Sequence, residues 1–194
     1  MLIDSLIRVL EGPRHDPTRT VGLVIYLVAS IGCFTAFAKT RRDRASHRWF
    51  WFAQGTVQLL FLLDTRFDWR LRLADLGRNV AQAGGWYAQR GPTQEWLLAG
   101  GVVVFLALLV WVRHRFARDS PATIALGGTA LSLASRIAEV ISWHDLDRGL
   151  YQSLGPLMVV GWAWLLGGLA IAIGAVGEVF LASRRKQLYP RAAA

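Results

Sequence analysis

Long apolar stretches constrain this chain more than any other feature of its sequence. A helix that crosses the hydrocarbon core of a bilayer needs about 20 mostly apolar residues. The sequence therefore predicts an all-α integral membrane protein, a single transmembrane domain over residues 1–194 with five transmembrane helices. The five stretches that reach or approach the required length cover about residues 20–38, 49–66, 96–112, 121–143 and 157–182.

The composition agrees with a membrane protein. Hydrophobic residues make up 54% of the 194 residues and charged residues 18%, against about 25% charged in an average soluble domain. The mean hydropathy of +0.34 also excludes intrinsic disorder, since disordered chains are poor in apolar residues. The net charge of +9 would by itself suggest nucleic acid, but so apolar a chain is better matched to a lipid bilayer. We therefore expect the bilayer, and no nucleic acid, as a partner.

Basic residues concentrate in alternate segments between the apolar stretches. Segments 39–48, 113–120 and 184–194 together hold 12 basic and two acidic residues, whereas the N-terminus with segments 64–95 and 144–156 holds nine of each. Short loops rich in Lys and Arg remain on the cytoplasmic side. The pattern predicts a multi-pass protein of the bacterial inner (cytoplasmic) membrane with a periplasmic N-terminus and a cytoplasmic C-terminus. A four-span arrangement would place two basic loops on opposite faces.

Two further segments have the pattern of amphipathic helices that lie on a membrane surface. The shorter one covers about residues 2–10. The longer one covers about residues 67–83, where charged and amide side chains fill the rest of the helix surface and apolar residues recur at helical spacing: Trp69, Leu73, Leu76 and Val80. We expect an interfacial connector at 67–83; a lid or a docking surface for a partner is the alternative.

Ionisable side chains within the apolar stretches mark a candidate site, because such groups are costly in lipid. Asp64 and Arg136 each lie 15 residues after the cytoplasmic start of their stretch, which is about 22 Å along a helix. They can therefore meet as an ion pair near the outer face. Glu139 follows Arg136 by three residues on the same helix face and can share it. The predicted cluster at the outer mouth consists of Asp64, Arg136, Glu139, His144, Asp145 and Asp147.

This cluster has three possible roles. The first is structural, namely pairing between helices and capping of a short helix by Asp145 or Asp147. The second is binding of a lipid, a quinone or a partner. The third is acid–base catalysis, for which the candidates are His144, Asp147 and Glu139. The structural role is favoured, and no residue is assigned as catalytic.

No familiar metal, nucleotide or hydrolase motif is present in the sequence. The four histidines lack a close metal-ligand spacing, and Cys33 lies alone in an apolar stretch. There is no P-loop, HExxH or GxSxG pattern. We therefore predict no metal ligand and leave any cofactor unassigned. Glu178, near the cytoplasmic end of the last stretch, is expected to reach Arg184 or Arg185.

Small residues line the last apolar stretch. Such residues let helix backbones approach closely in a membrane, where lipid supplies no hydrophobic drive for association. We expect packing within the chain, with a partner helix or a flat cofactor as the alternative. The residues concerned are Gly161, Gly167, Gly168 and Gly174.

Two sets of residues between about 60 and 150 stand out as motifs. The first set is Leu63, Asp64, Leu76, Gly77, Arg78, Gly85, Trp86, Tyr87, Arg90 and Gln94, and the second is Arg136, Ser142, His144 and Asp147. Together they resemble a group of small polytopic bacterial inner-membrane proteins with GWY and SxHxxD motifs, a group that carries no assigned activity. The resemblance suggests that the outer polar residues are the distinctive part of the group.

We expect a non-enzymatic function. The small-residue stretches, the nine tryptophans and the lack of a catalytic or transport motif favour a small accessory or scaffold subunit. It would pack against partner subunits of a larger membrane complex, with electron transfer or photosynthesis as one setting. The alternative is an outer-leaflet enzyme or binding protein for a lipid-like anionic ligand. Arg136 would then hold the anion, and His144 would be the acid–base group, oriented by Asp147.

Overall fold

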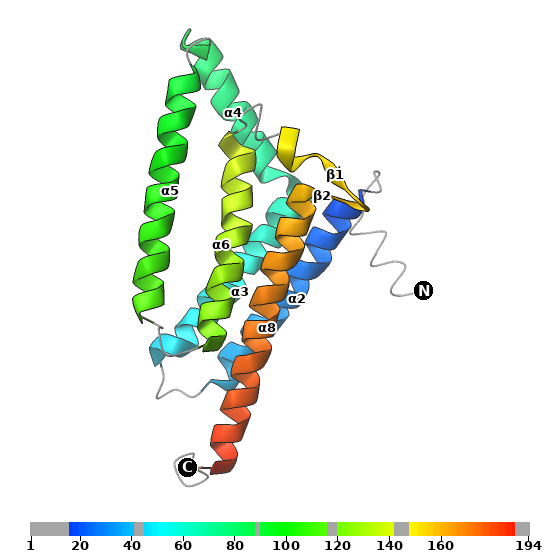
Figure 1. Ribbon diagram of the computed structural model, residues 1–194, viewed down its shortest axis with the longest axis vertical. Helices are drawn as coiled ribbons and strands as arrows, with labels where there is room; N and C mark the ends of the chain where they lie inside the picture. Colours follow the sequence, from blue (N-terminus) through cyan, green and yellow to red (C-terminus); the bar gives the residue numbers. More distant parts are fainter. Residues whose placement is uncertain (1–15, 41–44, 88–89, 116–119, 142–147, 189–194) are drawn as a thin grey trace.

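The computed structural model describes residues 16–40, 45–87, 90–115, 120–141 and 148–188, and most of these residues are helical (Figure 1). The expected all-α class is confirmed, with one hairpin of two short strands as the exception. In chain order the elements are α2 (Pro17–Lys39), α3 (Ala45–Phe67), α4 (Trp69–Ala83), α5 (Arg90–Arg115), α6 (Ser120–Ile141), β1 (Ser153–Leu154), β2 (Leu157–Met158) and α8 (Val159–Leu188).

Local chemistry explains where α2 begins and where α4 begins and ends. The Asp16 carboxylate accepts a hydrogen bond from the Thr18 backbone N–H at 2.9 Å and so caps α2, in the manner typical of helix N-termini. Between α3 and α4, Asp68 has a left-handed backbone with φ 55°, and this one residue redirects the chain. α4 ends at Gly84, and the next residue, Gly85, has φ 72°, which glycine adopts without strain.

Four of the helices form a packed bundle. α8 lies against both α2 and α6, and α3 lies against α2. Buried apolar side chains from these helices form two core clusters, one around Trp51 and Cys33 and the other around Tyr26 and Trp164. The hairpin β1–β2 sits at the end of the bundle where α8 begins (Figure 1).

Helix α5 is placed differently from the other long helices. It stands at the edge of the bundle and connects to the rest through α4 (Figure 1). Its main contact is with α6. Most of its described side chains are therefore exposed, among them Trp96, Val103, Val110 and Trp111.

Glycines allow α8 to approach its neighbours closely. A Cβ added at Gly168 would clash with the Ile25 side chain, so only glycine fits at this crossing without a shift of its neighbour. The four glycines singled out in the sequence all face another helix of the chain: Gly161 and Gly168 face α2, and Gly167 and Gly174 face α6. The structure thus places these glycines in contacts within the chain.

The bundle carries apolar side chains outside and polar ones inside. Large side chains that are about half exposed or more on α2 and α8 are Val24, Val28, Ile31, Leu166, Ile173, Val176 and Phe180. Buried polar or charged side chains include Gln54, Gln58, Ser132, Arg136, Glu139 and Glu178. This arrangement reverses the pattern of water-soluble proteins, in which amide and charged side chains are mostly exposed.

Two helices are long and apolar enough to cross a membrane by length and composition, namely Pro17–Lys39 and Val159–Arg184. They match the first and the fifth predicted spans. The predicted spans 49–66, 96–112 and 121–143 lie on α3, α5 and α6, which do not meet the same measure over the part of the chain that the structure describes. The predicted surface helix 67–83 corresponds to α4, whereas segment 2–10 lies outside the described residues.

The contact between α6 and α8 makes a first prediction. A Cβ at Gly128 would collide with the backbone carbonyl of Gly167 and lie 3.0 Å from the Ala170 Cβ, whereas a Cβ at Gly127 would meet nothing within 4 Å. We expect Gly128→Ala to lower the free energy of unfolding by about 1–3 kcal/mol through overpacking. The matched control, Gly127→Ala, should leave it unchanged or raise it by up to about 1 kcal/mol. Thermal unfolding in one detergent compares the two, and equal melting temperatures would contradict the tight contact.

Candidate functional site

Arg136 lies at the centre of a buried polar cluster near the end of α6. It is 5% exposed. Its guanidinium forms an ion pair with Asp64 of α3 and donates a hydrogen bond to the Thr65 hydroxyl. The helix arithmetic predicted the meeting of Arg136 and Asp64, and the structure brings the two together. Three aromatic rings lie 4.7–5.2 Å from the guanidinium carbon: Tyr26, Phe61 and Trp164.

A second arginine, Arg70 of α4, completes the charge balance of the cluster. Its Nε lies 3.0 Å from Glu139 Oε1, and its Nη1 lies 3.3 Å from Asp64 Oδ2. The Arg70 backbone N–H also donates to Asp64 Oδ1 at 2.8 Å. Burial alone would lower the pKa of the Arg70 guanidinium, but the Glu139 and Asp64 carboxylates raise it above its ordinary value. Arg70 is therefore held as a cation.

The place of Arg70 corrects the sequence interpretation in two respects. Arg70 was expected on the polar outer surface of an amphipathic helix, yet it is buried. The left-handed Asp68 redirects the chain immediately before it, so the first turn of α4 faces the bundle. Glu139 was expected to share Arg136 but pairs with Arg70 instead. The apolar positions of α4 meanwhile point outward, as Leu73, Leu76 and Val80 are all more than half exposed.

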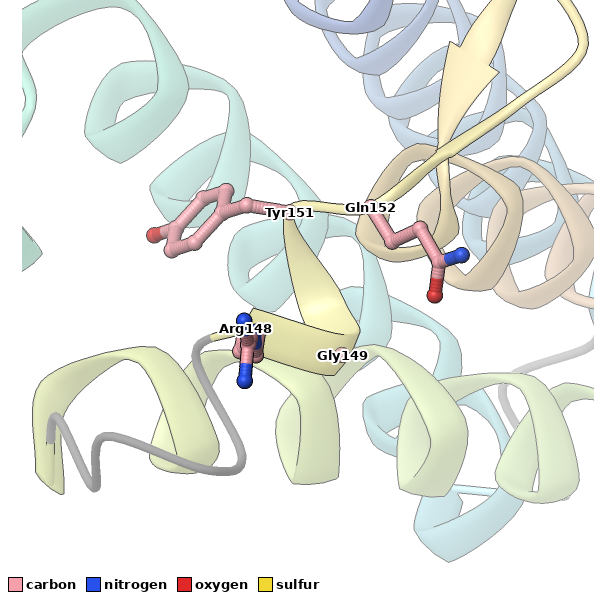
Figure 2. Close-up of a pocket in the computed structure, with 4 residues that line it drawn as sticks. All are labelled: Arg148, Gly149, Tyr151 and Gln152. Carbon is pink, nitrogen blue, oxygen red and sulfur yellow. The ribbon is translucent and has the colours of Figure 1, made fainter.

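The segment 148–152, which precedes the hairpin, contacts the cluster through Tyr151. The Tyr151 hydroxyl donates to Glu139 Oε1 at 3.1 Å. Figure 2 shows Tyr151 and Gln152 pointing to opposite sides of this segment, beside a hollow of about 570 Å³ that Arg148 and Gly149 also line. The hairpin is fastened to α2 because the Met158 backbone N–H donates to the Thr18 hydroxyl at 3.1 Å.

The charges of the outer cluster cancel. Arg70 and Arg136 are opposed by Asp64 and Glu139, and each arginine contacts at least one of these carboxylates. Both guanidinium groups are engaged with partners of the same chain, so binding an anion there would require an existing ion pair to break. The remaining predicted members, His144, Asp145 and Asp147, lie outside the described residues.

A second buried site with ionisable side chains lies at the opposite end of the bundle. Glu178 was expected to reach Arg184 or Arg185, but it is 1% exposed and pairs with His47. The distance between His47 Nε2 and Glu178 Oε2 is 2.8 Å. Thr40 donates to the other carboxylate oxygen at 3.3 Å, and the Trp51 indole N–H donates to His47 Nε2 at 3.4 Å. This site ties α3 to α8.

Further polar side chains lie between the Arg136 cluster and the His47–Glu178 pair. The Thr129 hydroxyl of α6 donates to Gln54 Oε1 at 2.8 Å. Further along, Gln58 and Ser132 are fully buried, and their side-chain polar atoms have no hydrogen-bond partner among the described residues. These positions were missed in the sequence analysis, although spacings of three and four residues along 47–65 place His47, Gln54, Gln58 and Thr65 on one helix face.

The described part of the chain contains no group of three or more His, Cys, Asp or Glu side chains placed to hold a metal ion. The buried thiol of Cys33 lies within an apolar core cluster. The described residues thus form two buried sites of paired ionisable side chains, with further polar side chains between them.

A second prediction compares two arginines of the same helix. Arg70 is buried against Glu139, whereas Arg78 forms an exposed pair with Asp75 at 3.0 Å. We expect Arg70→Met to destabilise the fold by about 3–5 kcal/mol, because it leaves the buried Glu139 carboxylate without its ion-pair partner. Arg78→Met should cost less than about 1 kcal/mol. Chemical unfolding in detergent, followed by circular dichroism, measures both, and a small effect at Arg70 would rule out its structural role.

Comparison with known proteins adds no assignment to these sites. No protein-family model matches the chain, and neither the curated protein sequences nor the solved structures include a significant match.

Proposed function

We propose that this chain is a small integral membrane protein that packs, as an accessory or scaffold subunit, against a larger membrane complex. In this proposal α2, α3, α5, α6 and α8 span the bacterial inner membrane, with the N-terminus in the periplasm and the C-terminus in the cytoplasm. α4 lies at the outer surface. An electron-transfer or photosynthetic complex is one setting for such a subunit.

The distribution of side chains supports the membrane location. The two most apolar helices expose their large side chains, for example Ile31 on α2 and Ile173 on α8. Soluble proteins rarely expose apolar patches larger than a few hundred Å². A lipid environment accommodates this surface, and it also gives a reason for placing Gln58 and Glu178 inside the bundle.

The tryptophans of α5 support its assignment as a span. Trp96 is 78% exposed and Trp111 is 65% exposed. They lie 15 residues apart, which is about 22 Å along a helix. Indole side chains favour the two membrane–water interfaces, and α5 carries one near each of its ends. The charge of the flanking segments gives the orientation, since Arg113 and the basic segment 39–48 would lie on the cytoplasmic side.

The isolation of α5 is the observation that carries the accessory role. The other long helices each pack along at least one bundle helix extensively, whereas α5 makes its main contact with α6 and leaves the rest of its surface exposed. Gly100 and Ala107 lie seven residues apart on the exposed surface, beside Val103. Small residues at such positions let a second helix approach closely. The partner that fits is an apolar transmembrane helix of another subunit.

The alternative function, binding or catalysis on an anionic lipid-like ligand at the outer leaflet, receives less support. It needs Arg136 to hold an anion, yet Arg136 is ion-paired to Asp64 and enclosed by aromatic rings. The neutral outer cluster is better suited to holding helices together.

The accessory role predicts a partner at α5. A photo-crosslinking residue at Val103 should join the protein, in its native membrane, to one defined membrane protein in about one-to-one ratio, as expected for a specific subunit contact. The same residue at Ile31 on α2, which is also exposed, should yield lipid adducts only.

A substitution tests whether that contact holds the complex together. Gly100→Leu adds bulk where a Cβ meets nothing within 4 Å of the chain, and Gly127→Leu on α6 does the same on another exposed surface. We expect Gly100→Leu alone to release the partner during size-exclusion chromatography in mild detergent. Lipid adducts at both crosslinking positions, or a lone monodisperse protein from native membranes, would overturn the accessory proposal.

A further inference from the structure

The geometry points to a proton path through the bundle, along the inner face of α3, that joins the Glu178–His47 pair at one end to the Glu139 cluster at the other. This inference rests on the membrane location proposed above but not on the partner at α5. It assigns to the polar interior a function beyond holding the helices together, namely transfer of protons between the two faces of the membrane.

The inner face of α3 is continuous and buried. Its members follow one another at steps of four and three residues, which keeps them on one side of a helix. Four of the six carry polar or ionisable groups, and each of the six is at most 9% exposed: His47, Trp51, Gln54, Gln58, Phe61 and Thr65. The opposite side of α3 is apolar and exposed, for example at Leu60.

The length of this face matches a membrane. His47 and Thr65 are 18 residues apart, which is about 27 Å along a helix, and the hydrocarbon core is about 30 Å thick. His47 contacts the Glu178 carboxylate, and Thr65 contacts Arg136, which pairs with Asp64. Each end of the face therefore meets a carboxylate of the kind that relays protons in membrane proteins.

Between the ends, polar atoms from three other helices line the same face. Ser132 of α6 and Tyr26 of α2 are fully buried, and the Tyr26 hydroxyl lies near both Ser132 and the Arg136 guanidinium. Among the described residues these hydroxyls lack a hydrogen bond of good geometry, as do both amide atoms of Gln58 and the Trp164 indole N–H. Buried polar groups of this kind bind ordered water, and water linked to hydroxyl and amide groups conducts protons.

Two arginines lie at the Glu139 end of the route. Among the described residues, the titratable or charged groups near Glu139 are Arg70, Arg136, Asp64, Tyr26 and Tyr151. The two cations are balanced by Asp64 and Glu139 before a proton arrives, and protonation of Glu139 weakens its contact with Arg70 during each transfer. At the other end, the described groups that face Glu178 are His47 and the neutral Thr40.

Trp51 interrupts the polar groups of the proposed route. Its ring is fully buried in an apolar cluster with Cys33 and Ile171, between His47 and Gln54. His47 and Gln54 are seven residues apart, or about 10 Å. Water and polar groups do not bridge an apolar layer of that thickness while Trp51 occupies it. We therefore infer that Trp51 separates two polar half-paths and limits the rate.

The transfer itself changes only O–H and N–H bonds. A proton from one aqueous face binds the Glu178–His47 pair and crosses the Trp51 layer when the Trp51 ring moves aside. It then passes through water beside Gln54 and Gln58 and reaches Glu139. Glu139 releases it toward the Tyr151 hollow, and each group returns to its original protonation state. The net result is one proton moved down its gradient, without a co-reactant.

The test measures proton flux into liposomes that hold the full-length protein and a pH-sensitive dye, with a potassium gradient and valinomycin as the driving force. We expect Trp51→Leu to raise the initial flux above that of the unmodified protein. Adding Gln58→Leu or Glu178→Gln should return the flux to that of protein-free vesicles. The matched control, Thr56→Val, should leave it unchanged, because Thr56 lies two residues from Gln58 on the other side of α3 and its hydroxyl bonds to Phe52 of the same helix.

The outcomes separate this inference from the proposed function. Flotation of the vesicles first shows whether the protein inserts, and failure to insert would overturn the membrane location and the path together. Inserted Trp51→Leu protein without flux, or flux that Gln58→Leu leaves intact, would overturn the path alone. If Glu178→Gln does not purify as a folded protein, the comparison of Gln58→Leu with Thr56→Val decides.

Discussion

The pairing of buried charges is the constraint on which this structure depends. An ion removed from water must find an opposite charge and hydrogen bonds, or the fold loses several kcal/mol. Arg136, Asp64, Arg70 and Glu139 meet this requirement among themselves, and in doing so they fix α3, α4 and α6 relative to one another. At the far end of the bundle, a histidine–glutamate pair fixes α3 against α8. α3 is thus held at one end by ion pairs and at the other by a histidine–carboxyl contact.

The proposed lipid environment accounts for both the apolar exterior and the polar interior. In lipid the hydrophobic effect does not drive helices together, so close glycine contacts and buried polar pairs take over that role. Gly128 against Gly167 is a contact of the first kind, and Thr129 against Gln54 is one of the second. The bundle encloses the polar face of α3, and in the proposed function the exposed surface of α5 contacts a neighbouring subunit.

Part of this arrangement can be predicted from the sequence. Apolar length locates α2 and α8, and counting residues along helices brings Asp64 to Arg136, because both follow from regular helix geometry. Residue spacing does not predict that Arg70 is buried, because its inward direction depends on the single left-handed residue Asp68. The His47–Glu178 pair depends on how two helices far apart in sequence are juxtaposed. The polar face of α3 can be recognised in the sequence, because its polar residues recur at helical spacing. It is found only if the buried side of the helix is expected to be polar.

The central claim is that the apolar surface of the bundle faces lipid. Spin labels attached to single cysteines at Ile31, Leu60 and Ile173, in a chain with Cys33→Ala, report collisions with oxygen and with a water-soluble nickel complex in vesicles. All three side chains are half exposed or more. The account predicts high oxygen and low nickel accessibility at each of the three positions, because oxygen concentrates in lipid. Nickel accessibility as high as at a label on Gly77 of α4, which is exposed at the proposed outer surface, would contradict it.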